Sequence, residues 1–222
     1  MPDDDVAPRG NGRAEVALGF VAGYTDVLGY LAVRVFSTHV TGNLALIFAN
    51  IDQPGAGLLG RLLAVPVFAA AAMAASLAVT RCGPPGRRAI RALLAVEVVL
   101  LLADMVAGAP LAGPHHALAP PVVVALMLVT AMGVHNAVNR FGVPRGNATG
   151  AMTVNVSQAA VDFGRLLNRH ADAATRGRLR ATVAVILAFV IGAASGAGAY
   201  ALARLWGLAL PAAIVAVYAI VL

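Results

Sequence analysis

The sequence predicts an all-α protein, a polytopic bundle of membrane-spanning helices, on two observations. Of its 222 residues, 60% are hydrophobic and 12% are charged, whereas a soluble domain carries about 25% charged residues. The apolar residues also gather in runs of about 20, the length that a helix needs to cross a bilayer. Because the chain is short, we expect a polar, disordered tail over 1–13 and a single transmembrane domain over 14–222.

All sixteen basic residues are arginines, and the formal net charge is +6. Such a charge is typical of nucleic-acid binding, but these arginines lie in short segments between apolar runs, as the positive-inside rule predicts. The expected partner is therefore the lipid bilayer and not a nucleic acid. The single cysteine, Cys82, excludes an internal disulfide or a cysteine-based metal site, and no cofactor is expected. A composition rich in Ala, Gly and Arg without Lys is typical of GC-rich bacterial genomes.

Six apolar runs are predicted to span the membrane. The first is as long as a full span and no small-residue cleavage site follows it, so we do not expect a cleavable signal. Two prolines open the fourth run, where a first helical turn tolerates them. In chain order the predicted spans are 14–33, 58–80, 92–106, 120–138, 181–202 and 207–222.

Two further elements are too short to cross. The first, 37–50, has the polar and backbone-permissive tripeptide Thr41-Gly42-Asn43 at its centre. The second, 147–155, is a weaker copy around Thr149 and Gly150. Both are interpreted as broken helices that enter the membrane and leave on the same side.

The arginines set the orientation. The basic segments 81–91 and 165–180 are expected in the cytoplasm and the Arg-free segment 108–119 outside. If both short elements crossed, an odd number of crossings would separate the two basic segments and place them on opposite sides. The preferred arrangement is therefore six spans, with a cytoplasmic N-terminus and two non-crossing elements on opposite faces. A seven-span arrangement, in which only 37–50 crosses, also satisfies the charges.

The six-span arrangement implies an inverted 3+3 repeat, because 14–107 and 118–222 have the same order of elements in opposite orientations. Secondary transporters and some channels share this architecture. Short matching motifs in the two halves support the repeat. Gly23-Tyr24-Thr25-Asp26 matches Gly133-Val134-His135-Asn136, and Thr41-Gly42 matches Thr149-Gly150. Gly192 and Gly196 form a G-xxx-G pair that permits close helix contact, although Gly and Ala are frequent throughout the chain.

Three stretches carry a family resemblance: Gly23-Tyr24-Thr25-Asp26 with Gly29, His39-Val40-Thr41-Gly42-Asn43, and Gly133-Val134-His135-Asn136-Ala137 leading to Thr149-Gly150. From about residue 14 to 220 the chain resembles the YoaK family of bacterial multi-pass membrane proteins. The family often has Gln-Asn where this chain has His135-Asn136. The resemblance implies an inner-membrane protein of about six spans and no established substrate.

The candidate site lies where the two short elements would meet. Asp26 lies near the middle of the first span, where a charged Asp costs roughly 2.5–3.5 kcal/mol. It is interpreted as a substrate contact or proton carrier; the alternative is a structural Asp that hydrogen-bonds the broken backbone or pairs with Arg34. The candidate substrate-binding residues are Tyr24, Asp26, His39, Thr41, Gly42, Asn43, His135, Asn136, Thr149 and Gly150.

A half-helix that starts at Thr41-Gly42-Asn43 would point its unpaired N–H groups and positive dipole end into the protein, which favours an anion or a carbonyl. The alternative is a plain helix start with Thr41 or Asn43 as N-cap. His39 is expected to be a neutral hydrogen-bonding residue, and Glu97 to pair with an arginine such as Arg91. His115 and His116 lack a third ligand, so no metal site is expected.

The favoured function is an inner-membrane transporter or channel for an unknown small solute. An intramembrane enzyme would need a nucleophile–base pair or a metal constellation, and the acids are too scattered to form one, so an enzyme is not expected. The alternative is a structural or partner-binding membrane protein that transports nothing.

Overall fold

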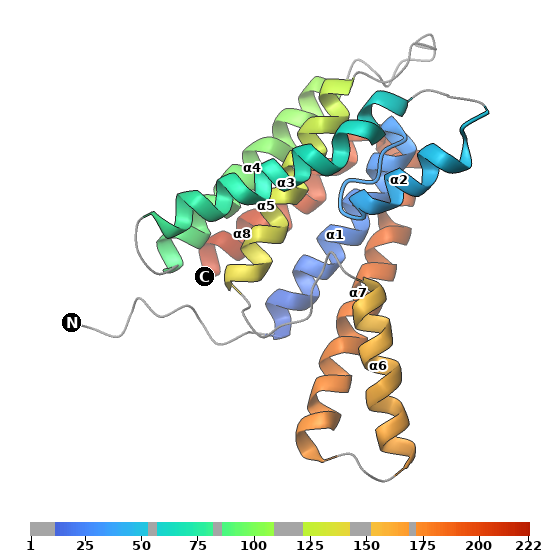
Figure 1. Cartoon of the computed structure of the whole chain (residues 1–222). Coiled ribbons are helices and arrows are strands. Elements are labelled where there is room, and N and C mark those ends of the chain that lie inside the picture. The colour runs from blue at the N-terminus through green and yellow to red at the C-terminus, as the bar shows by residue number, and fades with distance from the viewer. Residues whose placement is uncertain (1–11, 53–56, 82–85, 109–121, 143–151, 169–171) are drawn as a thin grey trace.

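The structure is a computed structural model that describes residues 12–52, 57–81, 86–108, 122–142, 152–168 and 172–222. In these ranges every regular element is a helix, as expected for the all-α class (Figure 1). The elements are α1 (Gly12–Val33), α2 (Val40–Ala49), α3 (Leu58–Thr80), α4 (Arg87–Gly108), α5 (Val122–Gly142), α6 (Met152–Leu167), α7 (Ala173–Ala203), the 3-10 helix η3 (Arg204–Leu208) and α8 (Ala209–Val221).

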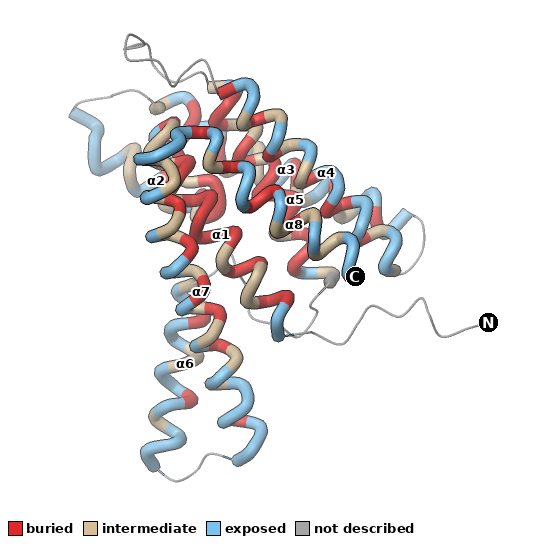
Figure 2. The backbone as a smooth tube through the Cα atoms, turned by 180° about the vertical axis from the view of Figure 1, so that it is seen from behind, coloured by how far each residue is buried: buried red, intermediate tan, exposed pale blue. Residues whose placement is uncertain are grey.

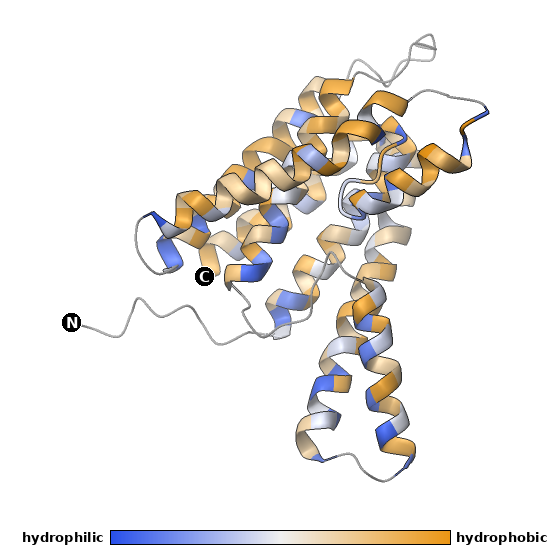
Figure 3. Ribbon diagram, viewed as in Figure 1, coloured by the Kyte–Doolittle hydropathy of each residue, from blue (hydrophilic) through white to orange (hydrophobic). Residues whose placement is uncertain are grey.

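The chain is a polytopic helical membrane protein. Four stretches of the described chain are long and apolar enough to cross a bilayer: Gly12–Val33, Leu58–Thr80, Val122–Phe141 and Ala173–Val221. The last runs through α7, η3 and α8. Apolar residues dominate these helices in Figure 3. Helix α4 is as long as α1 but falls outside this group, because it carries charged residues at Arg87, Arg88, Arg91, Glu97 and Asp104.

Most predicted spans agree with the observed helices, but two helices begin well before the apolar run. The bounds of α3 coincide with the predicted span. Helix α4 begins at Arg87, five residues early, and α7 begins at Ala173, eight residues early. The early start of α7 has a local cause, since Asp172 is the N-cap and its side chain accepts a hydrogen bond from the backbone N of Thr175 at 2.7 Å. Such a cap satisfies an N–H group that has no partner within the helix.

Helices α1 and α5 form the inside of the bundle. In their apolar windows 61% and 67% of residues are buried, against 17% in α3, and Figure 2 shows the buried positions along both. The hydroxyl of Thr25 lies 3.0 Å from Sδ of Met132, and Gly29 faces Leu128. Since residue numbers rise along α1 as they fall along α5, the two helices are antiparallel.

Each inner helix packs closely along a parallel outer helix. On α1, Gly19 faces Val185 of α7, and a Cβ added at Gly23 would overlap the backbone oxygen of Phe189. On α3, Gly60 faces Ala125 of α5. A Cβ added at Gly133 would lie 2.9 Å from the backbone oxygen of Phe68 and 3.4 Å from the backbone N of Ala72. Because α1 is antiparallel to α5 and α3 is parallel to it, α1 and α3 run in opposite directions.

Helices α4 and α8 close the other side of the bundle. Helix α4 is antiparallel to α5, since Ile90 and Leu94 share a core cluster with Val138 and Leu101 shares another with Leu128. The chain reverses at η3: α7 ascends beside α1, and α8 then returns beside both α1 and α4.

Helix α6 and the start of α7 form a hairpin that extends away from the other helices (Figure 1). Arg178 donates Nε and Nη2 to the two carboxylate oxygens of Asp162, each at 2.7 Å. This hydrogen bonding lowers the pKa of Asp162 to about 2. The predicted second short element, 147–155, lies largely outside the described residues; its last residues form the first turn of α6, which at 16 residues is longer than expected.

Candidate functional site

The connection between α1 and α2 folds back into the bundle. Helix α1 ends at Val33, and Arg34 follows with a φ of 58°. The hydroxyl of Thr38 then donates to the backbone oxygen of Ala22 at 3.3 Å. Ala22 lies eleven residues before the end of α1, which is roughly 16 Å at 1.5 Å per residue. The chain therefore returns this far along α1 before α2 begins.

Asp26 holds the tip of this re-entrant segment. Its side chain is buried, and Oδ1 accepts hydrogen bonds from the backbone N of Thr38 at 2.7 Å and of His39 at 3.3 Å. Because α2 starts at Val40, the carboxylate lies at the N-terminal end of the helix, where N–H groups lack helical partners and the dipole favours an anion. The anion that this helix start was predicted to attract is thus supplied by the chain itself. Among the alternatives for Asp26, these contacts are those of a residue that satisfies the broken backbone, and Arg34 is not a partner.

His39 forms a close pair with Asp26. Its Nδ1 lies 2.7 Å from Oδ2 of Asp26, and its ring meets Phe189 edge-on with centroids 5.1 Å apart. The hydrogen bond to Asp26 raises the pKa of His39 above its ordinary value of 6.5, against an opposing effect of burial. The charged form of His39 is therefore favoured more than the sequence led us to expect.

Asn43, on α2, completes the group of side chains around Asp26 and His39, which we call the Asp26 corner. Asn43 is fully buried; its Oδ1 accepts from the backbone N of Phe36 at 2.9 Å and its Nδ2 donates to the backbone oxygen of Phe36 at 2.8 Å. Gly42 packs against the ring of Phe36. Thr41 is exposed. The expectation that Thr41 or Asn43 caps α2 was wrong, because His39 occupies the N-cap position and the Asn43 side chain binds the preceding turn.

None of the contacts given above involves the remaining candidates that the structure describes. Tyr24 is buried, and its hydroxyl donates to the backbone oxygen of Gly207 in η3 at 2.8 Å. Asn136 is half-buried on α5. Thr149 and Gly150 lie outside the described residues. The structure therefore brings together four of the candidates: Asp26, His39, Gly42 and Asn43.

His135 belongs to a second carboxylate–imidazole pair. Its Nδ1 lies 2.7 Å from Oε1 of Glu97, and both side chains are almost completely buried. The expected pairing of Glu97 with Arg91 was wrong. Sequence distance suggested it, but Glu97 lies on the face of α4 that packs against α5, whereas Arg91 is exposed. Oε2 of Glu97 and Nε2 of His135 have no hydrogen-bond partner among the described residues.

Two buried acidic residues were not among the sequence candidates, namely Glu97 and Asp104. Both are completely buried on α4. Their spacing was the available signal, since residues seven apart lie on the same side of a helix. Among the described residues, no group of three or more His, Cys, Asp or Glu side chains is placed to hold a metal ion.

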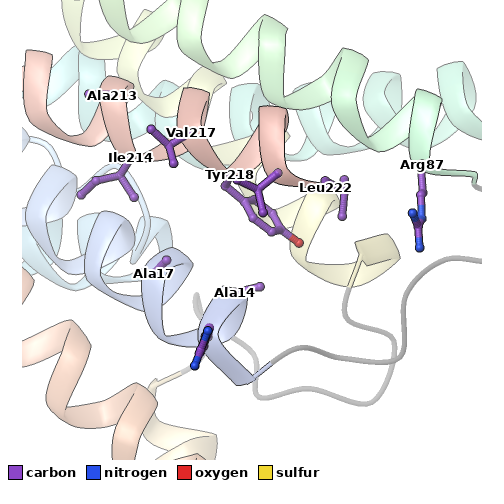
Figure 4. A pocket seen from close by; sticks show the side chains of 10 residues that line it. Ala14, Ala17, Arg87, Ala213, Ile214, Val217, Tyr218 and Leu222 are labelled. Carbon is purple, nitrogen blue, oxygen red and sulfur yellow. The ribbon is translucent and has the colours of Figure 1, made fainter.

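A cavity of about 610 Å³ lies at the other end of the bundle (Figure 4). The starts of α1 and α4 and the end of α8 enclose it, with Ala14, Arg87 and Tyr218 among its lining residues. None of the candidate site residues lines it.

A family model with the description "Protein of unknown function (DUF1275)" matches residues 15–221. The chain belongs to this family. The match covers nearly the whole chain and confirms the resemblance to the YoaK family that the three sequence stretches indicated. No curated protein and no solved structure matches the DUF1275 chain at a significant level.

Proposed function

We propose that this DUF1275 protein transports a small solute across the inner membrane of a bacterium, with the Asp26 corner as part of its path. The observation that carries the proposal is the pair that buried Asp26 forms with half-buried His39 at the tip of a re-entrant segment. Ionisable groups within a membrane domain usually mark substrate or ion pathways. Broken helices at mid-membrane are the usual form of transporter binding sites.

The proposed topology has six spans, α1, α3, α4, α5, α7 and α8. The antiparallel course of α1 and α3 supports it, because α2 must then begin and end on one side. The ten residues of α2 extend only about 15 Å, half the thickness of the hydrocarbon core. The seven-span alternative needs α2 to cross and is not favoured.

The two halves of this topology form the proposed inverted repeat. Its support is that helix contacts come in matched pairs: α1 with α7 and α5 with α3, α4 with α5 and α8 with α1, α2 with α3 and α6 with α7. The contacts also match in detail. Gly23 lies against Phe189 and Ala193 of α7. Gly133, the residue that matches Gly23 in the second half of the sequence, lies against Phe68 and Ala72 of α3. In both cases the partner residues are one helical turn apart.

In this repeat α6 is the counterpart of α2. The Asp162–Arg178 pair fixes α6 antiparallel to α7. Counting back ten residues from Asp162 places Met152 level with about residue 188 of α7, beside Phe189, which contacts His39. The starts of α2 and α6 thus approach a similar depth of the bundle from opposite ends, which supports a site between them.

The opening of the Asp26–His39 pair is the proposed binding step. A solute with an N–H group or positive charge replaces His39 at Oδ2 of Asp26, and Oδ1 keeps α2 in place through Thr38. The expected solutes are therefore small cations or neutral hydrogen-bond donors, since the Asp26 carboxylate already supplies the negative charge at the start of α2.

A partner-binding membrane protein is the second candidate. Its support is the exposed surface of α6, where Val154 and Val161 are exposed on one side and Phe163 on the other side of the face that is bound to α7. We propose no catalytic role for either candidate.

A thermal-shift screen on the purified full-length protein tests the transport proposal. A panel of small amines, amino acids, metabolite cations and neutral polar solutes is compared on the wild type and on Asp26→Asn. The expected result is stabilisation of the wild type by a solute class that Asp26→Asn no longer recognises, followed by uptake of that class into proteoliposomes. Hits that stabilise both proteins equally, or hits that the wild type does not take up, would overturn the proposal.

A further inference from the structure

The buried face of α4 carries an acidic row that the proposed solute path does not use. Glu97, Leu101, Asp104 and Gly108 recur at intervals of four, three and four residues, and all are buried. Leu101 shares a core cluster with Leu205 and Leu208 of η3, and a Cβ added at Gly108 would overlap the side chain of Leu205. Asp104 lies between these two contacts on the same face, so it faces the seam between α4 and η3.

Asp104 has no partner in this seam. It is completely buried, and neither carboxylate oxygen has a hydrogen-bond partner among the described residues. Glu97 differs, since one of its oxygens is bonded to His135. An ionised carboxylate without a partner is too costly to bury in apolar surroundings, and such a group takes up a proton instead.

The ionisable side chains on the elements that pack against α4 are engaged elsewhere or exposed. They are His135, bonded to Glu97; Arg140 and Arg81, exposed; Arg61, bonded to the backbone oxygen of Arg34; Arg204, over the ring of Tyr200; and Tyr218, in the cavity near Leu222. None of these described groups supplies a positive charge to Asp104.

On the other side of the seam, the helical path breaks where α7 ends and η3 begins. Arg204 has a φ of 51°, a left-handed conformation that non-glycine residues rarely adopt. Residues in such conformations are concentrated at functional and switching sites. η3 is only five residues long and is tied to the solute-path helix α1 by the Tyr24–Gly207 hydrogen bond. A displacement of η3 therefore moves an anchor of α1.

We propose that Asp104 is a proton-binding site whose loss of a proton opens the α4–η3 seam. With the proton bound, the neutral carboxylic acid remains buried and the seam is closed. When the seam opens, the proton passes to water, and the carboxylate stays hydrated. The proton is then the coupling ion of the protein. That coupling role rests on the proposed transport, whereas proton binding and the movement of η3 do not.

The chain contains its own reporter, because its single tryptophan, Trp206, lies in η3. The fluorescence of Trp206 is titrated from mildly acidic to alkaline pH in the full-length protein, reconstituted in lipid nanodiscs. The wild type is expected to show a one-proton transition. Asp104→Asn, which keeps the shape and removes the proton, is expected to show none. Glu97→Gln is the matched control on the same helix face and keeps the Asp104 transition.

Circular dichroism and thermal unfolding establish that each variant is folded. If Asp104→Asn does not fold, Asp104→Glu replaces it and is expected to keep a one-proton transition with a shifted midpoint. A wild type without a transition, an Asp104→Asn protein that titrates like the wild type, or an Asp104→Glu midpoint equal to that of the wild type overturns the inference. A correct titration without solute uptake would instead count against the proposed transport.

Discussion

At the scale of single residues, Asp26 on α1 and Asn43 on α2 both bind backbone groups of the connection between these helices. A backbone segment that turns inside a membrane protein must find its hydrogen bonds within the protein, because lipid offers none. Asp26 binds the N–H groups of Thr38 and His39, and Asn43 binds both polar groups of Phe36. The G-Y-x-D and H-x-T-G-N stretches therefore meet in one corner because each completes the other.

The Asp26–His39 pair gives the corner a dependence on pH. Because the pKa of His39 is raised in the folded protein, its contribution to stability is fully present below the ordinary value of about 6.5 and is lost as the pH rises through the folded-state value. The difference in thermal unfolding midpoint between the wild type and His39→Gln is expected to shrink over that range. Thr41→Ala, at an exposed position of the same turn, is the control and changes stability by no more than about 0.5 kcal/mol. A wild-type-to-His39→Gln difference that is constant with pH would contradict the pairing.

The sequence allowed prediction of residues that act on the nearby backbone, but not of residues that pair across helices. The polar tripeptide Thr41-Gly42-Asn43 indicated an interrupted helical path, and the structure has the interruption just before it, between Val33 and Val40. The partner of Glu97 could not be predicted, since it depends on which face of α4 meets α5. Asp104 was missed for the same reason: its burial without a hydrogen-bond partner depends on which elements pack against that face of α4.

At the scale of elements, the crossing of α1 with α7 depends on glycine on both helices. A Cβ added at Gly192 would overlap the backbone oxygen of Phe20, and one added at Gly23 would overlap that of Phe189. Such contacts allow backbones to approach and to form weak Cα–H···O hydrogen bonds. The G-xxx-G pair of Gly192 and Gly196, which could have reflected composition alone, is therefore a packing feature.

Gly192→Ala is expected to destabilise the protein by about 1–3 kcal/mol through overpacking, or to lower its unfolding midpoint by several degrees. Gly198→Ala is the matched control on the same helix, since no atom lies within 4 Å of its added Cβ. There the substitution is neutral or slightly stabilising, because alanine is the better helix former. Differential scanning fluorimetry in detergent measures both variants. Equal midpoints for the two proteins would contradict the close crossing.

Elements were predicted well where apolar runs have polar ends, and less well where helices continue into polar sequence. The span 58–80 was predicted at its observed bounds. The polar start of α7 and the whole of α6 carry too many Arg, Asp and Asn residues for hydropathy to detect, and mutual pairing through Asp162 and Arg178 stabilises them instead.

At the scale of the whole molecule, the chain belongs to the DUF1275 family and spans the membrane several times. The proposed function combines three features of this architecture: matched helix pairs, a re-entrant corner at Asp26 and a proton site at Asp104. The inverted relation between the two halves depends on α2 and α6 returning to the side from which they start, on opposite faces. If either element crosses, the two halves are no longer related by inversion.

Accessibility of single cysteines tests this topology most directly. In a Cys82→Ser background, cysteine replaces Asn50 at the end of α2 or Asn168 at the end of α6, both exposed positions. Intact cells with a permeable outer membrane are treated with a membrane-impermeant thiol reagent. Cysteine at position 50 is expected to react, and cysteine at position 168 to react only after the inner membrane is disrupted. Reaction of both, or of neither, in intact cells would place the two helix ends in one compartment and contradict the account.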